Sequence, residues 1–327
     1  MARAGTGTVT SSLILPAVVV AVASGGLVAA QGRLNGDLST AGAGVLLASW
    51  LSYVGTLATV VLVVLLRGRT RITASVLRHR GSWWWYAIGL CGIPIVLAMA
   101  AGIPLVGVAI ASVCSVAGQT VSGLGLDARG VGVPEPLRLS GRRLVAGVVA
   151  VLGLAVAVLS GSTGPSVDLG TMVAVGLMLF VAGVTLGGQQ AGNGRVTSLA
   201  GDPVVAGLTT AVGGTLGITL LTAGIAAAGG LDGVSLPALG SHWYLYLGGP
   251  LGAAITVGAA WAVRHLGTFA LTLAIVGGQM VTAMLIDVLG GVGLHWSTAV
   301  AAAMIAGATV IAVGRPRGAS PSHPVAA

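Results

Sequence analysis

The sequence contains no lysine and very few charged residues of either sign. Only 7% of its 327 residues are Asp, Glu, Lys or Arg, and all 15 basic residues are arginine. Soluble domains average about 25% charged residues, so a soluble fold of this length could not cover its surface with so few. This scarcity excludes a soluble protein. Hydrophobic residues make up 55% of the chain, as expected for a protein embedded in lipid.

Residues for catalysis or metal binding are also scarce. The only two cysteines, Cys91 and Cys114, lie inside apolar runs and have neither disulfide nor metal-site spacing, so we interpret them as packing residues. The five histidines lie in loops, at helix ends or in the C-terminal tail, and no Ser/His, Asp/Asp or His-x-x-x-His set occurs. No nucleotide-binding loop is present. We expect no enzymatic activity, no metal and no cofactor.

What the chain has is a succession of long apolar runs. Barrel strands would be shorter and would alternate in polarity, so the runs indicate transmembrane helices. The sequence therefore predicts an all-α membrane protein with ten transmembrane helices. Their approximate ranges are 13–31, 41–66, 83–102, 105–126, 143–159, 169–190, 203–228, 243–263, 267–289 and 296–313. Residues 1–12 form a polar N-terminal tail, 161–168 a linker, and 314–327 a tail expected to be disordered.

The two halves of the chain repeat one outline. Gly107, Gln119 and Asp127 recur 160 positions later, at 267, 279 and 287. Other landmarks recur at offsets of 158 or 159: Gln31 with Gln189, Asn35 with Asn193, Gly55 with Gly214, Trp84 with Trp243, and Gly89 with Gly248. We predict two five-helix repeats, 13–160 and 169–313. Because five is odd, the second repeat would enter the membrane in the opposite orientation, giving an inverted repeat.

The arginines predict the orientation. With the N-terminus inside, the inner loops and both tails hold 14 of the 15 arginines, and only Arg33 falls outside. Basic residues favour the cytoplasmic side, so we expect both termini in the cytoplasm. The net charge of +8 could suggest a nucleic-acid partner, but no basic patch with interleaved aromatics occurs. The lipid bilayer is the expected partner instead, and no nucleic acid is expected.

Polar residues inside the predicted spans are the candidate site. Gln119 and Gln279 each lie about 10 Å from a helix end, so the two amides would straddle the bilayer midplane from opposite sides. Hydroxyls share their helix faces at positions i−7 and i+3, and Ser115 adds one more. These hydroxyl residues are Ser112, Ser115 and Ser122 in the first repeat and Thr272 and Thr282 in the second. The stripes could bind substrate, or could hold the bundle together by interhelical hydrogen bonds.

The helix ends supply further candidates. Gln31 and Gln189 are predicted to end the first helix of each repeat and join the substrate-binding hypothesis. Arg33 could be an interfacial anchor or an outer-gate ligand, the anchor being favoured because Arg can extend to the interface. Asp127 and Asp287 could gate or carry protons, but solvated charges at helix ends are the favoured interpretation.

The order of these landmarks carries a family resemblance. A Gln-containing turn at 31–35 precedes Gly55-Thr56-Leu57, a Trp-rich helix start at 83–86, Gly278-Gln279 and the segment 285–290. The chain resembles the drug/metabolite transporter superfamily, an EamA-like group, in its YdcZ-like branch, as two fused units. The resemblance implies an exporter of a small metabolite, working by alternating access in the cytoplasmic membrane of a bacterium. Helices 1, 3, 4, 6, 8 and 9 would then line the cavity.

Two other functions are alternatives to an exporter. A non-transporting membrane partner or assembly protein would need no cavity, and matched polar stripes in two repeats weigh against it. An intramembrane enzyme would need a nucleophile with a base, or metal ligands, within the spans. The sequence leaves open whether the chain forms a homodimer.

Overall fold

The computed structural model describes residues 13–132, 136–137, 139–159, 168–290 and 296–313, and every regular element among them is helical. In a bilayer, helices satisfy their own backbone hydrogen bonds, so an apolar chain of this composition folds into helices. The elements are α1 (Ile14–Leu38), η2 (Ser39–Ala43), α2 (Gly44–Leu66), α3 (Thr70–Arg80), α4 (Trp83–Ala87), η3 (Ile88–Gly92), α5 (Ile93–Ala128), α6 (Gly141–Leu159), α7 (Leu169–Ala200), α8 (Pro203–Ala227), α9 (Leu239–His242), η4 (Trp243–Leu247), α10 (Gly248–Leu289) and α11 (Trp296–Val313).

Within the described part of the chain, five segments are long and apolar enough to cross a membrane. They are Ile14–Leu66, Trp83–Val108, Gly170–Ala200, Pro203–Ala227 and Leu239–Ile286, and Ala299–Ala308 is a shorter apolar helix. The first has 53 residues, which would measure about 80 Å as one straight helix, against a hydrocarbon core of about 30 Å. That segment contains α1 and α2, which are separated by η2, where Gly42 leaves the helical backbone.

The two longest helices break at equivalent glycines. Gly107 in α5 has φ 79° and ψ 164°, and Gly267 in α10 has φ 77° and ψ 165°. Only glycine adopts this backbone conformation without large strain. The break in α10 falls where the sequence predicted it. The boundary predicted at 102–105 in α5 is wrong, because Pro104 lies within the helix and the chain turns only at Gly107.

Other predicted boundaries also need correction. α1 continues to Leu38 and α7 to Ala200, so Gln31 and Gln189 lie inside helices rather than at their ends. The amide of Gln31 is satisfied inside the bundle by the carbonyl of Gly248, at 2.8 Å, and therefore does not require a solvated turn. The arginine-rich loop after α2 also folds into a helix, α3, which the sequence analysis missed.

The repeats cross one another through matched glycine contacts. A Cβ atom added to Gly278 in α10 would lie 1.8 Å from the carbonyl oxygen of Val22 in α1. The equivalent Gly118 in α5 stands against Phe180 of α7, where the distance would be 1.9 Å. Val22 and Phe180 are 158 positions apart, and Gly118 and Gly278 are 160 apart. Helix α1 of the first repeat thus packs on α10 of the second in the same way that α7 packs on α5.

Substitution of these glycines is expected to destabilise the crossing. Gly278→Ala places a methyl group where Val22 allows none, and overpacking of this kind costs about 1–3 kcal/mol or more. Gly277→Ala is the matched control, because a Cβ there meets nothing within 4 Å and alanine is the better helix former. Thermal unfolding in detergent should show a lowered midpoint for Gly278→Ala alone. Equal midpoints for the two variants would contradict the close crossing.

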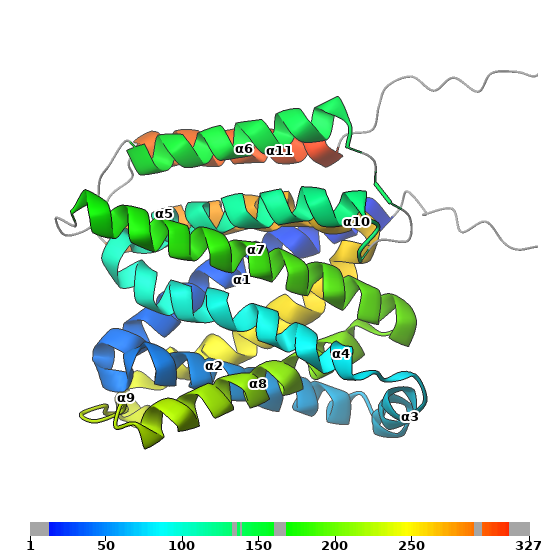
Figure 1. Ribbon diagram of the computed structural model, residues 1–327, viewed down its shortest axis with the longest axis vertical. Helices are drawn as coiled ribbons and strands as arrows, with labels where there is room; N and C mark the ends of the chain where they lie inside the picture. Colours follow the sequence, from blue (N-terminus) through cyan, green and yellow to red (C-terminus); the bar gives the residue numbers. More distant parts are fainter. Residues whose placement is uncertain (1–12, 133–135, 138, 160–167, 291–295, 314–327) are drawn as a thin grey trace, which may run out of the picture.

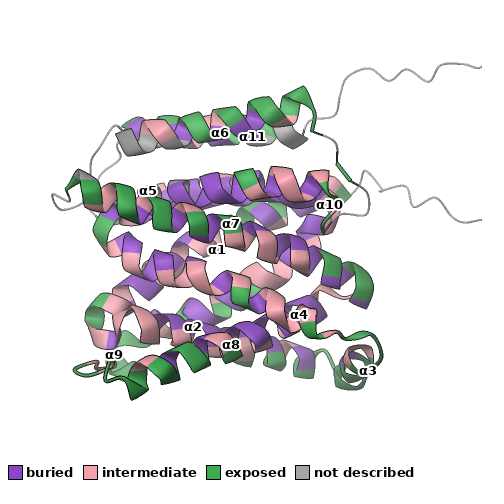
Figure 2. Cartoon of the chain, in the orientation of Figure 1, coloured by how far each residue is buried: buried purple, intermediate pink, exposed green. Residues whose placement is uncertain are grey.

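The helices stack in layers (Figure 1). α6 and α11 pair at one end of the molecule, α2 and α8 lie toward the other, and α1, α5, α7 and α10 fill the space between. Buried residues concentrate along α5 and α10, whereas α6 presents many exposed residues (Figure 2). Those exposed residues include Leu144, Val145, Val148 and Leu152, which are side chains suited to contact with lipid.

Candidate functional site

A cavity lies where the two repeats meet. It encloses about 100 Å³ available to the centre of a water-sized sphere. Equivalent residues of both repeats line it, which places it at the interface between them. These pairs include Gln31 with Gln189, Gly92 with Gly252, Ile95 with Ile255, and Val96 with Thr256.

Each of the two paired glutamines lies over a glycine of the opposite repeat. A Cβ atom on Gly92 would lie 2.4 Å from Nε2 of Gln189, and one on Gly252 would lie 2.6 Å from Nε2 of Gln31. Glycine at these positions leaves the amides room to reach the cavity. Gln31 also donates to Ser52 Oγ at 3.2 Å, which fixes its orientation.

A smaller second cavity adjoins the first. It encloses about 40 Å³ by the same measure, and five amide side chains contribute to its wall: Gln119, Gln189, Gln190, Asn193 and Gln279. Both cavities share Val28, Leu186, Gln189, Ile255 and Thr256 as lining residues. The predicted pair Gln119 and Gln279 therefore does converge on one space, together with Gln189.

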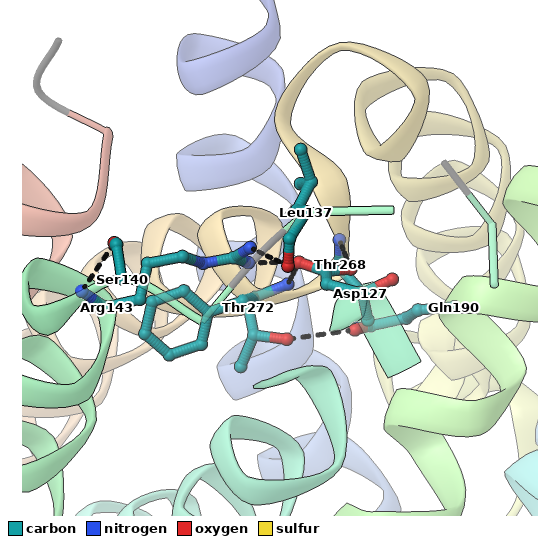
Figure 3. Close-up of polar contacts among 8 residues, drawn as sticks. Asp127, Leu137, Ser140, Arg143, Gln190, Thr268 and Thr272 are labelled. Carbon is teal, nitrogen blue, oxygen red and sulfur yellow. Dashed lines mark hydrogen bonds and ion pairs between the residues drawn. The ribbon is translucent and has the colours of Figure 1, made fainter. Parts of the chain in front are cut away.

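A chain of hydrogen bonds orients two of the amides in the wall of this second cavity, those of Gln119 and Gln190. Thr272 Oγ1 donates to Gln190 Oε1 at 3.3 Å, and Gln190 Nε2 donates to Gln119 Oε1 at 3.3 Å (Figure 3 shows Gln190 and Thr272). Gln119 and Thr272 are both fully buried or nearly so. The interhelical hydrogen bond predicted for the polar stripe is thus present at Gln119, whose amide also lines a cavity, and substrate binding by Gln119 stays a prediction.

Gln279, on the same wall, has no such chain, because both of its amide atoms are buried without a hydrogen-bond partner among the described residues. The hydroxyl of Ser112, which lines neither cavity, is also buried without a partner there. A buried amide without a partner costs about 1–3 kcal/mol, so Gln279 needs an explanation.

The other predicted hydroxyl groups either form hydrogen bonds within their own helix or pack against a neighbouring helix. Ser115 Oγ donates to the carbonyl of Ser112 at 2.8 Å, and Ser122 Oγ to that of Gln119 at 3.0 Å. Thr282 packs beside Gly26, where a Cβ atom would lie 2.8 Å from its Oγ1. None of Ser115, Ser122 and Thr282 lines either of the two cavities described above.

Asp127 is not a solvated end charge, so that interpretation is wrong. Its side chain is fully buried, and its two oxygens accept from the backbone N–H groups of Thr268 at 2.8 Å and Phe269 at 2.9 Å. Arg143 completes the group through an ion pair with the same carboxylate (Figure 3). The break at Gly267 begins a new helical segment, whose free N–H groups attract an anion. Asp127 supplies that anion from the other repeat.

Two further candidates lie away from the cavities. Arg33 pairs with Asp37 at 2.9 Å in α1, and both side chains are about 40% exposed, as in a surface ion pair. The side chain of Asp287 lies outside the part of the chain that the structure describes.

The lining of both cavities carries no charge among the residues described. Its polar groups are amides, hydroxyls and the phenol of Tyr53. Within the described ranges, no group of three or more His, Cys, Asp or Glu side chains could hold a metal ion.

Gln190 is the residue whose role the sequence analysis missed. The sixth predicted helix, 169–190, ends at this residue, whereas in the structure Gln190 lies inside α7 and joins Gln119 to Thr272 in the core. The sequence does contain a signal for this role. The offset of 158 that matches Gln31 with Gln189 aligns Gln190 with Gly32, so one repeat has an amide where the other has no side chain.

An apolar chain whose described elements are all helical, with an amide-lined cavity between two repeats, is typical of integral membrane proteins built from two copies of one unit. A family model described as "Putative inner membrane exporter, YdcZ" matches residues 16–156 and again 174–315. The chain belongs to this family, of the drug/metabolite transporter type, and contains two copies of its unit.

The fold itself is similar to that of a solved protein. A structure described only as "Crystal structure of protein" superposes with a TM-score of 0.63 over 92% of this chain and 96% of that chain, at 20% sequence identity. At this identity the likeness concerns the fold alone. No match was found among curated proteins.

Proposed function

We propose that the protein is a secondary transporter that exports a small, uncharged polar metabolite by alternating access. The observation that carries this proposal is the cavity between the repeats, lined by paired amides and no charged group. A charged solute entering it would lose its hydration without gaining a counter-charge, which is costly in a low-dielectric interior. A neutral solute with donors and acceptors would exchange hydrogen bonds to water for bonds to the lining amides.

We further propose ten membrane spans arranged as two inverted repeats. The kink at η2 and the glycine breaks divide the long apolar segments, and the repeats become residues 13–160 and 169–313. Two contacts support this arrangement. Arg80 donates to the carbonyl of Leu199 at 3.4 Å, and Ser235 N donates to that of Gly42 at 3.1 Å. The first contact joins the C-terminal ends of α3 and α7, which are both assigned to the cytoplasmic side, and the second joins η2 to the segment between α8 and α9, which are both assigned outside.

Reporter fusions test the orientation. Fusions after Arg80 and after Asp232 should give cytoplasmic and external signals respectively, because arginines gather in the loops on the first side. A reporter that is active only in the cytoplasm, paired with one active only outside, makes the result independent of expression level. The same signal from both positions would contradict ten spans with cytoplasmic termini.

Transport itself is tested by comparing metabolites. Cells with and without the protein should differ in the retention of a small set of neutral polar compounds, with those compounds enriched in the medium when the protein is present. A difference confined to anions or cations would contradict the uncharged site, and no difference under any growth condition would contradict export.

A further inference from the structure

The two repeats carry different residues at the equivalent positions 190 and 32. Gln190 in α7 places its amide between Gln119 of the first repeat and Thr272 of the second. The equivalent position in α1 is Gly32, which has no side chain to reach the corresponding partners. Those partners are Gln279, 160 positions after Gln119, and Ser112, 160 positions before Thr272.

Two of the unpaired buried atoms, Gln279 Oε1 and Ser112 Oγ, are those that an amide at position 32 would bond by this pattern. Gln279 Nε2 and Oε1 and Ser112 Oγ are all buried without a partner, whereas their equivalents Gln119 and Thr272 are bonded to Gln190. The pairing of the helices does not depend on sequence offset alone. Gly25 of α1 approaches Ile275 as Gly183 of α7 approaches Ser115, with added Cβ atoms 1.7 and 1.8 Å from the two carbonyl oxygens.

We propose that the substrate supplies the missing group. A neutral carboxamide, or a group with the same adjacent donor and acceptor, binds Gln279 and Ser112 as Gln190 binds Gln119 and Thr272. Its N–H donates to Gln279 Oε1, and its oxygen accepts from Ser112 Oγ. The adjoining cavity of about 40 Å³, which Gln279 lines, has room for a few water-sized spheres, comparable to the three heavy atoms of a carboxamide. This proposal rests on the transport function proposed above and narrows its substrate class.

In this proposal Gly32 determines specificity because it has no side chain and so leaves the place of an amide to the ligand. Gly32→Gln should place the protein's own amide in the site and exclude the ligand. A Cβ atom there would lie 2.8 Å from Cδ1 of Ile103, so the substitution is combined with Ile103→Val, which removes that atom. Ile103→Val alone is the matched control.

The test is ligand-dependent thermal unfolding of the purified full-length protein, with propionamide, N,N-dimethylpropionamide and propionate as probes. Propionamide should raise the unfolding midpoint saturably in wild type and Ile103→Val. The dimethyl analogue lacks the N–H groups and should bind at least tenfold more weakly, and propionate should not bind. The Gly32→Gln/Ile103→Val protein should unfold at a higher temperature than Ile103→Val without ligand and should not respond to propionamide.

A second variant guards against misfolding of the first. Gln279→Met keeps the shape of the side chain, removes its amide, and should lose the propionamide response. The proposal is overturned if the dimethyl analogue stabilises equally, if propionamide has no effect on wild type, or if Gln279→Met responds as wild type does. If wild type exports metabolites while the amide proposal fails, only the substrate class is wrong. Absence of export by wild type would instead overturn the transport function.

Discussion

Asp127→Asn is expected to destabilise the protein by about 3–5 kcal/mol. The substitution leaves the guanidinium of Arg143, whose side chain is only 11% exposed, without its carboxylate, and breaking a buried pair on one side is costly. The amide of asparagine can accept from only one of the N–H groups of Thr268 and Phe269 and turns a donor toward the other. The start of the segment after Gly267 therefore loses part of its cap.

Asp37→Asn is the control for this effect. It breaks the pair with Arg33, where both partners are exposed, and such helical pairs contribute only about 0.3–0.5 kcal/mol. Replacing both members, as Asp127→Asn with Arg143→Met, should recover part of the loss because no unpaired charge remains. Reversible unfolding in mixed detergent measures all three. An Asp127→Asn protein as stable as Asp37→Asn would show that the buried contact does not hold the repeats together.

Gln279→Leu is expected to reduce export of the identified metabolite more than tenfold without lowering stability. The amide of Gln279 has no partner to lose, so its removal should leave stability unchanged or raise it by about 1–3 kcal/mol. Gln119→Leu should also reduce export more than tenfold, but should lower stability by about 1 kcal/mol because the bond with Gln190 is lost. The two equivalent glutamines thus separate a binding role from a packing role.

Thr222→Val is the matched control for both substitutions. Thr222 is a buried polar residue in α8 whose hydroxyl bonds only to Ile218 of its own helix, away from either cavity. Its loss should leave export unchanged. Stability and export are measured on the same preparations. Full export by a Gln119→Leu/Gln279→Leu double variant would remove the site, and a large loss of stability in Gln279→Leu would show a packing role instead.

Much of the architecture could be predicted because its causes are local or periodic. The arginine-poor apolar runs and the constant spacing of Gly107 and Gly267 identified helices and repeats directly. The precise ends of α1 and α7 could not be predicted, because polar residues such as Gln31 resemble a turn unless their partner is known. That partner, the carbonyl of Gly248, lies 217 residues away in the chain.

Part of the candidate site could also be predicted from the sequence. Helical spacing identified Gln119 and Gln279 as candidates, and both line the smaller cavity. The burial of Asp127 could not be predicted, because the local sequence around a charged residue at a helix end is the same whether the side chain faces water or the end of a second helix. The role of Gln190 required the crossing of α7 with α5 and α10, which only the three-dimensional packing defines.

The difference between Gly32 and Gln190 also bears on how a ligand sits. Two identical units related by a two-fold axis would offer every ligand two equivalent poses, related by the axis. Under the proposed binding mode, Gln190 fills one of the two half-sites, so a ligand would have a single pose and forgo the twofold degeneracy, a statistical term of about 0.4 kcal/mol. A solute with two different ends would therefore be carried with the same end leading in every cycle.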